Sequence, residues 1–189
     1  MASIVIDHLQ RRFPSNEVAI LYIYCAYNAQ YKAKELVAAL LRQLIHRLTA
    51  LPEAVKDLHK RHTQIQTSPT REELTQVLGS VASGFSRVFV VIDALDECRE
   101  EDNTRTEFLD SIKKIKQFAN MLVTSRHIPA IEEEFKGELQ EEIRATDEDI
   151  TTYIKAKVKE KSSLSAYISA KPSLQADIVS KIVSKANGM

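Results

Sequence analysis

Apolar residues follow two patterns along the chain, and these patterns predict its helices and strands. Long segments repeat apolar positions every three to four residues, which predicts helices that bury one face. Short runs are almost entirely apolar, which predicts strands covered on both faces. Helices are expected at residues 2–13, 34–49, 52–65, 70–84, 108–118, 128–135, from 146 onward, 163–170 and 173–186. Strands are expected at residues 18–26, 88–93 and 120–126, with a weaker one at 139–143.

Helices that alternate with short buried strands are typical of an α/β fold, in which a parallel sheet is flanked by helices. After the weak strand, the chain shows helical periodicity alone. We therefore expect an α/β core over residues 1–145 and a small all-helical segment over residues 146–189. The charged stretch 99–107 is expected to be a loop.

Two of the helix starts carry capping signatures. Thr70 is followed three residues later by Glu73, a capping box in which each side chain satisfies an unpaired backbone N–H. Thr146 stands before three acids that end with Asp149, and acids in the first turn complement the helix dipole.

The charge balance and hydropathy exclude some classes of partner. Lysine plus arginine and aspartate plus glutamate both number 26, so no net positive field attracts a polyanion, and nucleic acid is not an expected partner. The longest nearly uncharged apolar stretch, residues 18–29, is shorter than the ~20 residues that span a bilayer. The first residues lack the charge order of a secretion signal. We expect a cytoplasmic protein without membrane contact.

Candidate metal ligands are sparse in the sequence. Cys25 and Cys98 are the only cysteines, form no CxxC pair and are expected to be reduced thiols. His59 and His62 lie one helical turn apart and could share a metal ion. Because no third ligand is near them, we expect an ordinary solvated helix face.

Three acids follow the most apolar strand. Asp93 ends the run, and Asp96 and Glu97 come directly after it. The carboxyl edge of a parallel sheet is where ligands bind in open α/β folds. An aspartate there can hold magnesium through water, and the metal then bridges nucleotide phosphates. Asp96 and Glu97 could orient or deprotonate an attacking water. The alternative is a solvated loop after a core strand.

Arg126 leaves the next strand at the same edge. Its guanidinium could reach a terminal phosphate, since its planar fork matches phosphate oxygens. The alternative is a surface arginine at the start of a loop.

A phosphate-binding glycine loop is not found in the sequence. Gly79 and Gly84 have the spacing of G-x-x-x-x-G, but Phe85-Ser86 follows where Lys-Ser/Thr is needed. The segment also lies between a helix and a strand, which reverses the order that the motif requires. Gly84 is expected to end the helix instead.

Three strings together carry a family resemblance. VFVVIDALDEC, MLVTSR and ATDEDITTYI, in this order, resemble the NACHT-type NTPase domain of fungal NOD-like signalling proteins, also described as nephrocystin-like STAND ATPases. The resemblance implies an incomplete P-loop NTPase-like sheet and Mg-ATP or Mg-GTP as the ligand. It implies that Asp93 is the Walker B aspartate, Asp96 and Glu97 extend that motif, and Arg126 is the sensor arginine.

The chain departs from this family at both ends. The first strand and the Walker A loop of the family find no counterpart, and residues 146–189 match only the start of the helical lid subdomain. In the family the first strand lies between the strand that ends near Arg126 and the one near Leu139. We therefore expect a weakened or rearranged sheet, weak nucleotide binding and negligible hydrolysis.

The leading hypothesis is a truncated module of a nucleotide-dependent switch of a NOD-like receptor, itself not competent for hydrolysis. The alternative is a nucleotide-independent module whose helices, especially residues 34–49 and the C-terminal set, bind another copy or NOD-like receptor partners. A third possibility is a small NTPase that borrows a phosphate loop from another chain.

Overall fold

The structure is a computed structural model that describes residues 1–100, 102–160, 167–168 and 173–186. Its elements, in chain order, are α1 (Ala2–Arg12), β1 (Val18–Tyr24), α2 (Ala33–Ile45), α3 (Glu53–Gln64), α4 (Arg71–Ala82), β2 (Arg87–Asp93), the 3-10 helix η1 (Leu95–Glu97), α5 (Thr104–Ile115), β3 (Asn120–Val123), α6 (Pro129–Glu134), α7 (Asp147–Glu160) and α9 (Ser173–Ala186).

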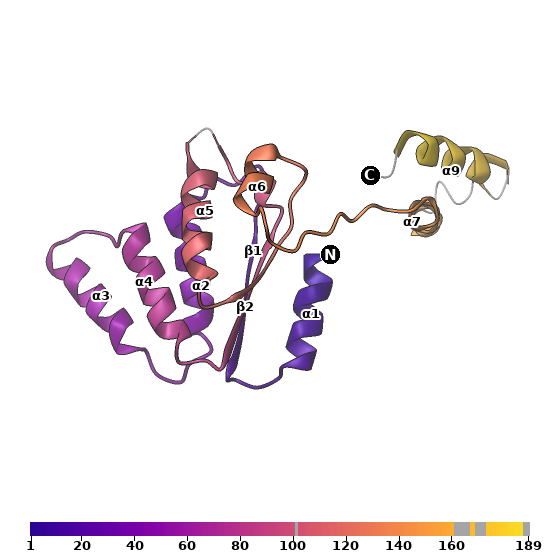
Figure 1. Ribbon diagram of the computed structural model, residues 1–189. Coiled ribbons are helices and arrows are strands. Elements are labelled where there is room, and N and C mark those ends of the chain that lie inside the picture. The colour runs from indigo at the N-terminus through magenta and orange to yellow at the C-terminus, as the bar shows by residue number, and fades with distance from the viewer. Residues whose placement is uncertain (101, 161–166, 169–172, 187–189) are drawn as a thin grey trace. The chain divides into compact units, whose positions relative to one another are not determined.

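The three described strands form one parallel sheet in the order β1-β2-β3 (Figure 1). Tyr24 at the end of β1 pairs with Asp93 at the end of β2, and Ile92 pairs with Val123 at the end of β3. All three strands therefore end at the same edge of the sheet. The expected α/β fold, a parallel sheet flanked by helices and followed by a helical segment, is confirmed.

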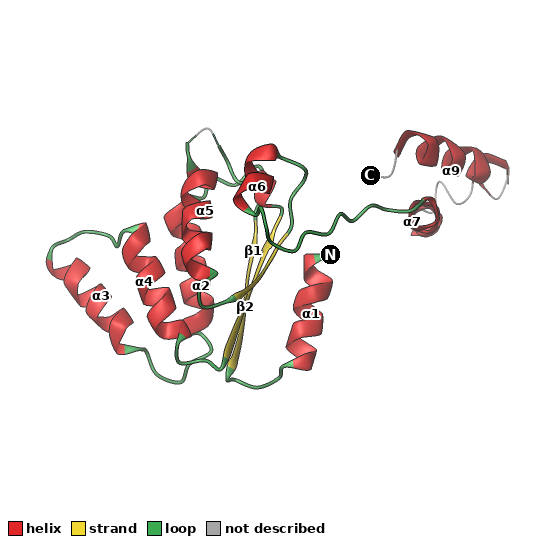
Figure 2. Ribbon diagram, in the orientation of Figure 1, coloured by secondary structure: helices red, strands yellow, loops and turns green. Residues whose placement is uncertain are grey.

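Helices cover the two faces of this sheet (Figure 2). Val90 and Ile92 of β2 pack with α2, α4 and α5 on one face, whereas Val91 packs with Ile6 of α1 on the other. Successive strand residues point to opposite faces, so β2 needs apolar residues at nearly every position. This two-sided burial explains the VFVVI run.

Helix α2 lies against β1 and also satisfies its open edge. Leu40 and Leu44 are fully buried, so the helix expected at residues 34–49 is a core element. Gln43 of the same helix accepts the backbone N–H of Tyr22 through Oε1 (3.0 Å) and donates from Nε2 to the Tyr22 carbonyl (2.8 Å). The side-chain amide thus takes the place of a neighbouring strand at this position.

The start of α4 is held by the predicted capping box and by a histidine. Thr70 and Glu73 exchange the expected bonds. The cap expected at Thr146 is confirmed as well, because its hydroxyl accepts the Asp149 N–H, and the Thr146 N–H donates to the Asp149 carboxylate in return. The solvated face predicted for His62 is wrong. Its Nδ1 lies 2.7 Å from Thr67 Oγ1 and its Nε2 lies 3.0 Å from Glu73 Oε2, in a buried position between α3 and α4.

The two glycines with phosphate-loop spacing belong to a helix end. Gly79 lies within α4, and a Cβ there would come 3.2 Å from the ring of Phe118. Gly84 follows the C-cap residue of α4, and its N–H donates to the Val81 carbonyl. The helix therefore ends just before Gly84, and Gly79 permits a close helix-to-ring contact.

Two further local predictions are wrong. Residues 139–143 form no strand, because Leu139 is 99% exposed and no neighbouring strand is present among the described residues. The loop predicted for residues 99–107 gives way to α5 at Thr104, where a side-chain oxygen of Asp102 accepts the Thr104 N–H. Most of the helix predicted at residues 163–170 lies outside the described residues.

The chain forms two compact units, Met1–Lys136 and Gly137–Met189. The first holds the sheet and its helices, and Ile131 of α6 joins its core. In the second, α7 and α9 pack against each other. The acidic strand end and its surroundings all lie in the first unit.

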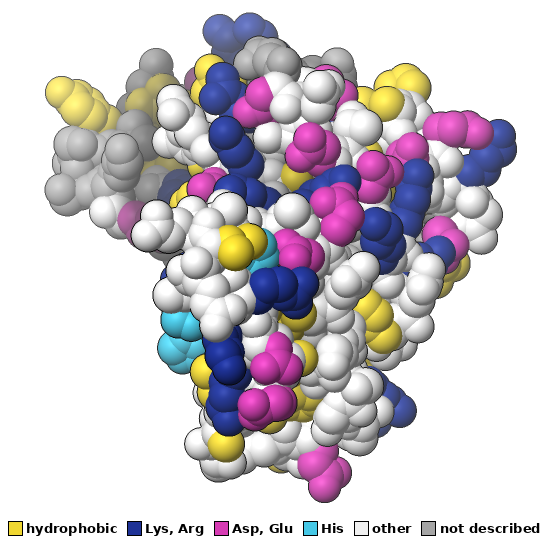
Figure 3. Space-filling model, turned by 90° about the vertical axis from the view of Figure 1, so that its left-hand side faces the viewer, with side chains coloured by type: hydrophobic (Ala, Val, Ile, Leu, Met, Phe, Trp, Pro, Cys, Tyr) yellow, Lys and Arg dark blue, Asp and Glu magenta, His cyan; other side chains and the backbone are white. Residues whose placement is uncertain are grey.

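The surface that carries α3 and α4 mixes the two signs of charge. Lysine and arginine side chains alternate there with aspartate and glutamate (Figure 3). This distribution agrees with the zero formal net charge of the chain. None of the described helices has the length and apolar character needed to cross a membrane.

Candidate functional site

The carboxyl ends of β2 and β3 are joined by the side chains of Asp93 and Thr124. The Thr124 hydroxyl donates to Asp93 Oδ1 over 2.6 Å and accepts the backbone N–H of Ala94 over 2.9 Å. The Thr124 backbone N–H donates to the Ile92 carbonyl, which continues the ladder between the two strands. One hydroxyl therefore fixes both the carboxylate that ends β2 and the turn that follows it.

The turn after Asp93 depends on an unusual backbone conformation at Ala94. Its φ is 56° and ψ is 52°, the left-handed region that costs a residue with a Cβ about 1 kcal/mol or more. The bond from its N–H to Thr124 and the burial of Leu95, which is 0% exposed, hold this conformation. As a result η1 starts at once, and Asp96 and Glu97 stay close to the sheet edge.

Both carboxylate oxygens of Asp96 accept hydrogen bonds from Arg126. Asp96 Oδ1 accepts the Arg126 backbone N–H (3.1 Å), and Oδ2 accepts from Nε (2.5 Å). The Asp96 side chain is 4% exposed, whereas that of Arg126 is 79% exposed. Burial alone would raise the pKa of Asp96, but the bonds from Arg126 outweigh it and lower that pKa below its usual value. The same pair raises the pKa of Arg126.

Glu97 connects η1 to the segment that follows β1. Its Oε2 accepts the backbone N–H of Tyr27 over 3.1 Å. The Cys25 backbone N–H donates to the Asp93 carbonyl nearby, which extends the pairing of β1 and β2 by one bond. These two bonds hold the β1–α2 connection against the acidic turn.

All four candidate residues from the sequence lie at this one edge. Asp93, Asp96 and Glu97 have separate partners, namely Thr124, Arg126 and the Tyr27 backbone. The contact of Thr124 with Asp93 was only weakly indicated by the sequence, through the position of Thr124 two residues before Arg126. Tyr27 contributes its backbone N–H to Glu97, and the sequence gives no indication of such a bond.

The donor set allows one mode of magnesium binding. Within the described ranges, no three His, Cys, Asp or Glu side chains are grouped so that they could hold a metal ion. Asp93 is a single carboxylate whose Oδ1 is already bonded to Thr124. Such a residue fits Mg²⁺ held through water, with the other ligands supplied by water and phosphate oxygens.

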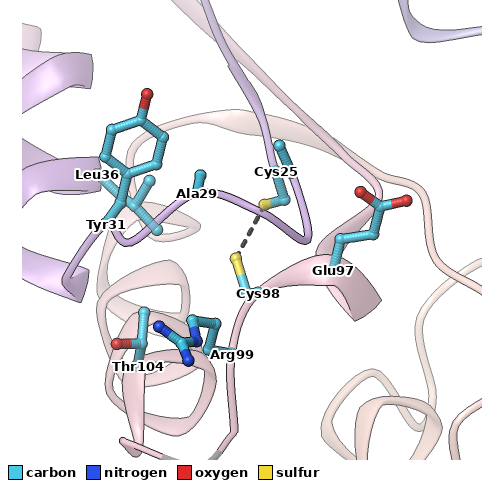
Figure 4. A pocket seen from close by; sticks show the side chains of 9 residues that line it. Cys25, Ala29, Tyr31, Leu36, Glu97, Cys98, Arg99 and Thr104 are labelled. Atoms are coloured by element: carbon cyan, nitrogen blue, oxygen red, sulfur yellow. Dashed lines mark hydrogen bonds between the residues drawn. The ribbon is translucent and has the colours of Figure 1, made fainter.

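A small hollow opens next to the acidic turn, between η1 and the β1–α2 connection (Figure 4). Tyr31, Leu36, Glu97 and Thr104 contribute to its lining. Its cavity volume is about 10 Å³, far below the roughly 300 Å³ or more of a small-molecule pocket. The hollow can admit a water-sized molecule and has no room for a nucleotide.

A family model described as "Nephrocystin 3, N-terminal" matches residues 1–126 of the 189-residue chain. The chain belongs to this family. The part that matches the nephrocystin 3 N-terminal model contains the whole sheet, both acidic residues of η1 and Arg126.

Beyond this nephrocystin 3 N-terminal match, no curated protein matches the sequence. Among solved structures, a "Replication initiator DnaA bound to AMPPCP and single-stranded DNA" is similar at a TM-score of 0.35 and 16% sequence identity. That match covers 100% of this chain, which spans 61% of the DnaA chain.

Proposed function

We propose that this chain carries the acidic, magnesium-side half of a NACHT-type nucleotide site, in which ATP or GTP sets the state of a signalling switch. The hydrogen bond between Thr124 and Asp93 carries the proposal. It orients a carboxylate at the carboxyl edge of a parallel sheet, where ligands of such sheets bind. If the residues after β2 were only a solvated loop, the Asp93 carboxylate would point into water and would not need the hydrogen bond from Thr124.

The four residues take different roles in this proposal. Asp93 would hold Mg²⁺ through water, and the metal would supply the positive charge that lets phosphates approach the carboxylates. Asp96 and Glu97 orient the water around the terminal phosphate. Arg126 senses that phosphate, because an exposed guanidinium bound to Asp96 can exchange this partner for a phosphate oxygen.

Phosphate affinity is expected to be low. In P-loop sites, backbone N–H groups and a lysine cradle the phosphates, and the 189 residues contain no such motif. Three carboxylates without that cradle repel phosphate unless magnesium is bound. We therefore propose that the chain alone binds nucleotide weakly, only with magnesium, and does not hydrolyse it.

Calorimetric titration of the whole chain with Mg-ATP and Mg-GTP, with and without EDTA, tests this proposal. The weak binding should vanish with EDTA and in Asp93→Asn, and it should persist in Glu53→Gln, which removes an exposed charge on α3. Nucleotide binding that is unchanged by EDTA and by Asp93→Asn would contradict the assignment of this site. Hydrolysis at ordinary NTPase rates that is lost in Asp93→Ala would overturn the proposed inactivity.

We propose a protein-interaction surface as the second candidate function. Its apolar surface is formed by Tyr22 and Tyr24 on the sheet face that carries α1, where they are 36% and 48% exposed. The two tyrosine rings form an edge-to-face pair with centroids 5.7 Å apart. The helix at residues 34–49 is a poorer candidate for this role, because its apolar face is buried in the core.

Light scattering over a concentration series separates this second candidate from the first. Self-association should fall in the Tyr22→Ser/Tyr24→Ser double variant and remain in Tyr27→Ser, whose side chain is exposed outside the strand. A monomer at every concentration would contradict self-association through this surface.

A further inference from the structure

Cys25 and Cys98 are far apart in the sequence and adjacent in the fold. Cys25 directly follows β1, and Cys98 is the C-cap residue of η1. Their Sγ atoms lie 2.9 Å apart although 73 positions separate them along the chain, and Figure 4 shows the two sulfurs pointing at each other. Both residues are free thiols and each is 8% exposed.

The surroundings of the pair make the two thiols unequal. The hydrogen bond with Cys25 lowers the pKa of Cys98 against the opposing effect of burial, and the charge of Arg105 lowers it further. The same bond and burial raise the pKa of Cys25. Cys98 is therefore the sulfur that ionises first, and its thiolate then accepts a hydrogen bond from the Cys25 thiol.

The hollow beside η1 gives small molecules access to these sulfurs. Both cysteines line it, and it is open to solvent. A water-sized reagent fits there, whereas a bulky thiol reagent does not. Access for a small oxidant and a ready second thiol are the two conditions for fast disulfide formation within one chain.

We propose that Cys25 and Cys98 form a redox-modification site, which a peroxide closes into a disulfide and a thiol reductant reopens. The Cys98 thiolate attacks one oxygen of hydrogen peroxide, the O–O bond breaks, and hydroxide leaves and takes up the proton released by the thiol. The Cys98 sulfenic acid is then attacked by the Cys25 sulfur. The S–O bond breaks, the S–S bond forms, and water leaves with the Cys25 proton.

Closing the bond requires little movement and has a local consequence. The sulfurs must approach by roughly 0.9 Å to reach the usual S–S length of about 2.05 Å. The disulfide ties the end of β1 covalently to η1, which carries Asp96 and Glu97. The redox state of the pair thus sets how far the acidic turn can move from the sheet edge, whether or not the chain binds nucleotide.

Thiol counting on the purified chain tests this modification directly. The chain has only two cysteines, so an internal disulfide must join them. After hydrogen peroxide treatment and alkylation in denaturant, mass spectrometry should show two labelled thiols falling to none, with full recovery after dithiothreitol. In Cys25→Ser, Cys98 should accumulate as a dimedone-reactive sulfenic acid. In Cys98→Ser, Cys25 should react much more slowly.

Thermal unfolding supplies a second readout that needs no variant. A disulfide that closes so long a loop should raise the Tm of the oxidised chain on the order of ten degrees, and dithiothreitol should reverse the rise. Two free thiols that persist under peroxide, or disulfides formed only between chains, would overturn the proposal. An internal disulfide that appears only in denatured protein would overturn it as well.

Discussion

Thr124 and Asp93 are joined side chain to side chain across the ends of two adjacent parallel strands, with 2.6 Å between the hydroxyl and the carboxylate oxygen. The same hydroxyl accepts the N–H of Ala94, whose φ is positive. The pair therefore links the chemistry expected of the site to the backbone turn that presents it.

Thr124→Val should lower the free energy of unfolding by about 1–3 kcal/mol, because a half-buried N–H and a carboxylate oxygen both lose their partner. Thr124→Ser keeps the hydroxyl and should lose less than about 1 kcal/mol. Urea unfolding followed by circular dichroism measures both. Equal stability of the valine variant and the original chain would show that water replaces the hydroxyl without cost.

The Asp96 carboxylate should make stability depend on pH in the acid range. Because bonds from Arg126 lower its folded-state pKa, the contribution of Asp96 is complete above the unfolded value of about 3.9 and is lost as pH falls through the folded pKa. Asp96→Asn should therefore be less stable than the original chain by about 1 kcal/mol at pH 5–7, a modest value because solvent screens the exposed guanidinium.

The difference between the two chains should shrink below pH 4, as measured by urea midpoints at successive pH values. Arg126→Gln retains the backbone bond to Asp96. Its stability difference from the original chain should also shrink below pH 4, but it should be smaller than that of Asp96→Asn at every pH. A difference that stays constant from pH 7 to pH 3 would exclude ionisation of Asp96 as its source.

His62→Ala should lower the free energy of unfolding by about 1–3 kcal/mol. The buried ring bonds to Thr67 and Glu73, and its loss removes packing between α3 and α4 together with both bonds. His59→Ala, at an exposed position of the same helix, is the matched control and should change stability by less than about 0.5 kcal/mol. Equal effects of the two substitutions in thermal unfolding would contradict the structural role of His62.

The sheet and the acidic edge could be predicted from the sequence because both follow from local patterns. A run such as VFVVI is apolar at consecutive positions only when both faces are covered, and Asp93 marks where that cover ends. The rule that parallel strands end at one edge then places Arg126 at the same edge as Asp96, whereas their direct contact is known from the structure. Helix caps are equally local, and those predicted at Thr70 and Thr146 are found where expected.

Two of the wrong predictions, the strand at residues 139–143 and the solvated position of His62, depend on neighbours that are distant in sequence or not present in the described structure. Leu139 and Ile143 have the apolar character of a strand, but a strand forms only with a hydrogen-bonding partner, and none lies beside them in the described structure. His62 has the spacing of a surface histidine, and only the position of α4 buries it. The contact between Cys25 and Cys98 requires the exact β1–β2 register, in which Tyr24 pairs with Asp93.

Gln43 should protect the outer edge of β1. Its amide binds both the N–H and the carbonyl of Tyr22, so it occupies the two groups that another strand would use. Gln43→Ala exposes these groups at the edge and should lower the free energy of unfolding by about 1–2 kcal/mol. It should also increase association at high protein concentration, since an open edge can pair with another chain. Light scattering and urea unfolding measure the two effects separately.

Gln43→Glu distinguishes edge protection from simple packing. A glutamate fills the same space and still accepts the Tyr22 N–H, but at pH 7 it places a carboxylate against the Tyr22 carbonyl, where the amide donated. Edge protection therefore predicts that the glutamate variant is at least as destabilised as the alanine variant. Arg42→Ala, at the adjacent exposed position, should change stability by less than about 0.5 kcal/mol. A glutamate variant as stable as the original chain would show that Gln43 acts by filling space, because the donated bond is the only interaction that this substitution removes.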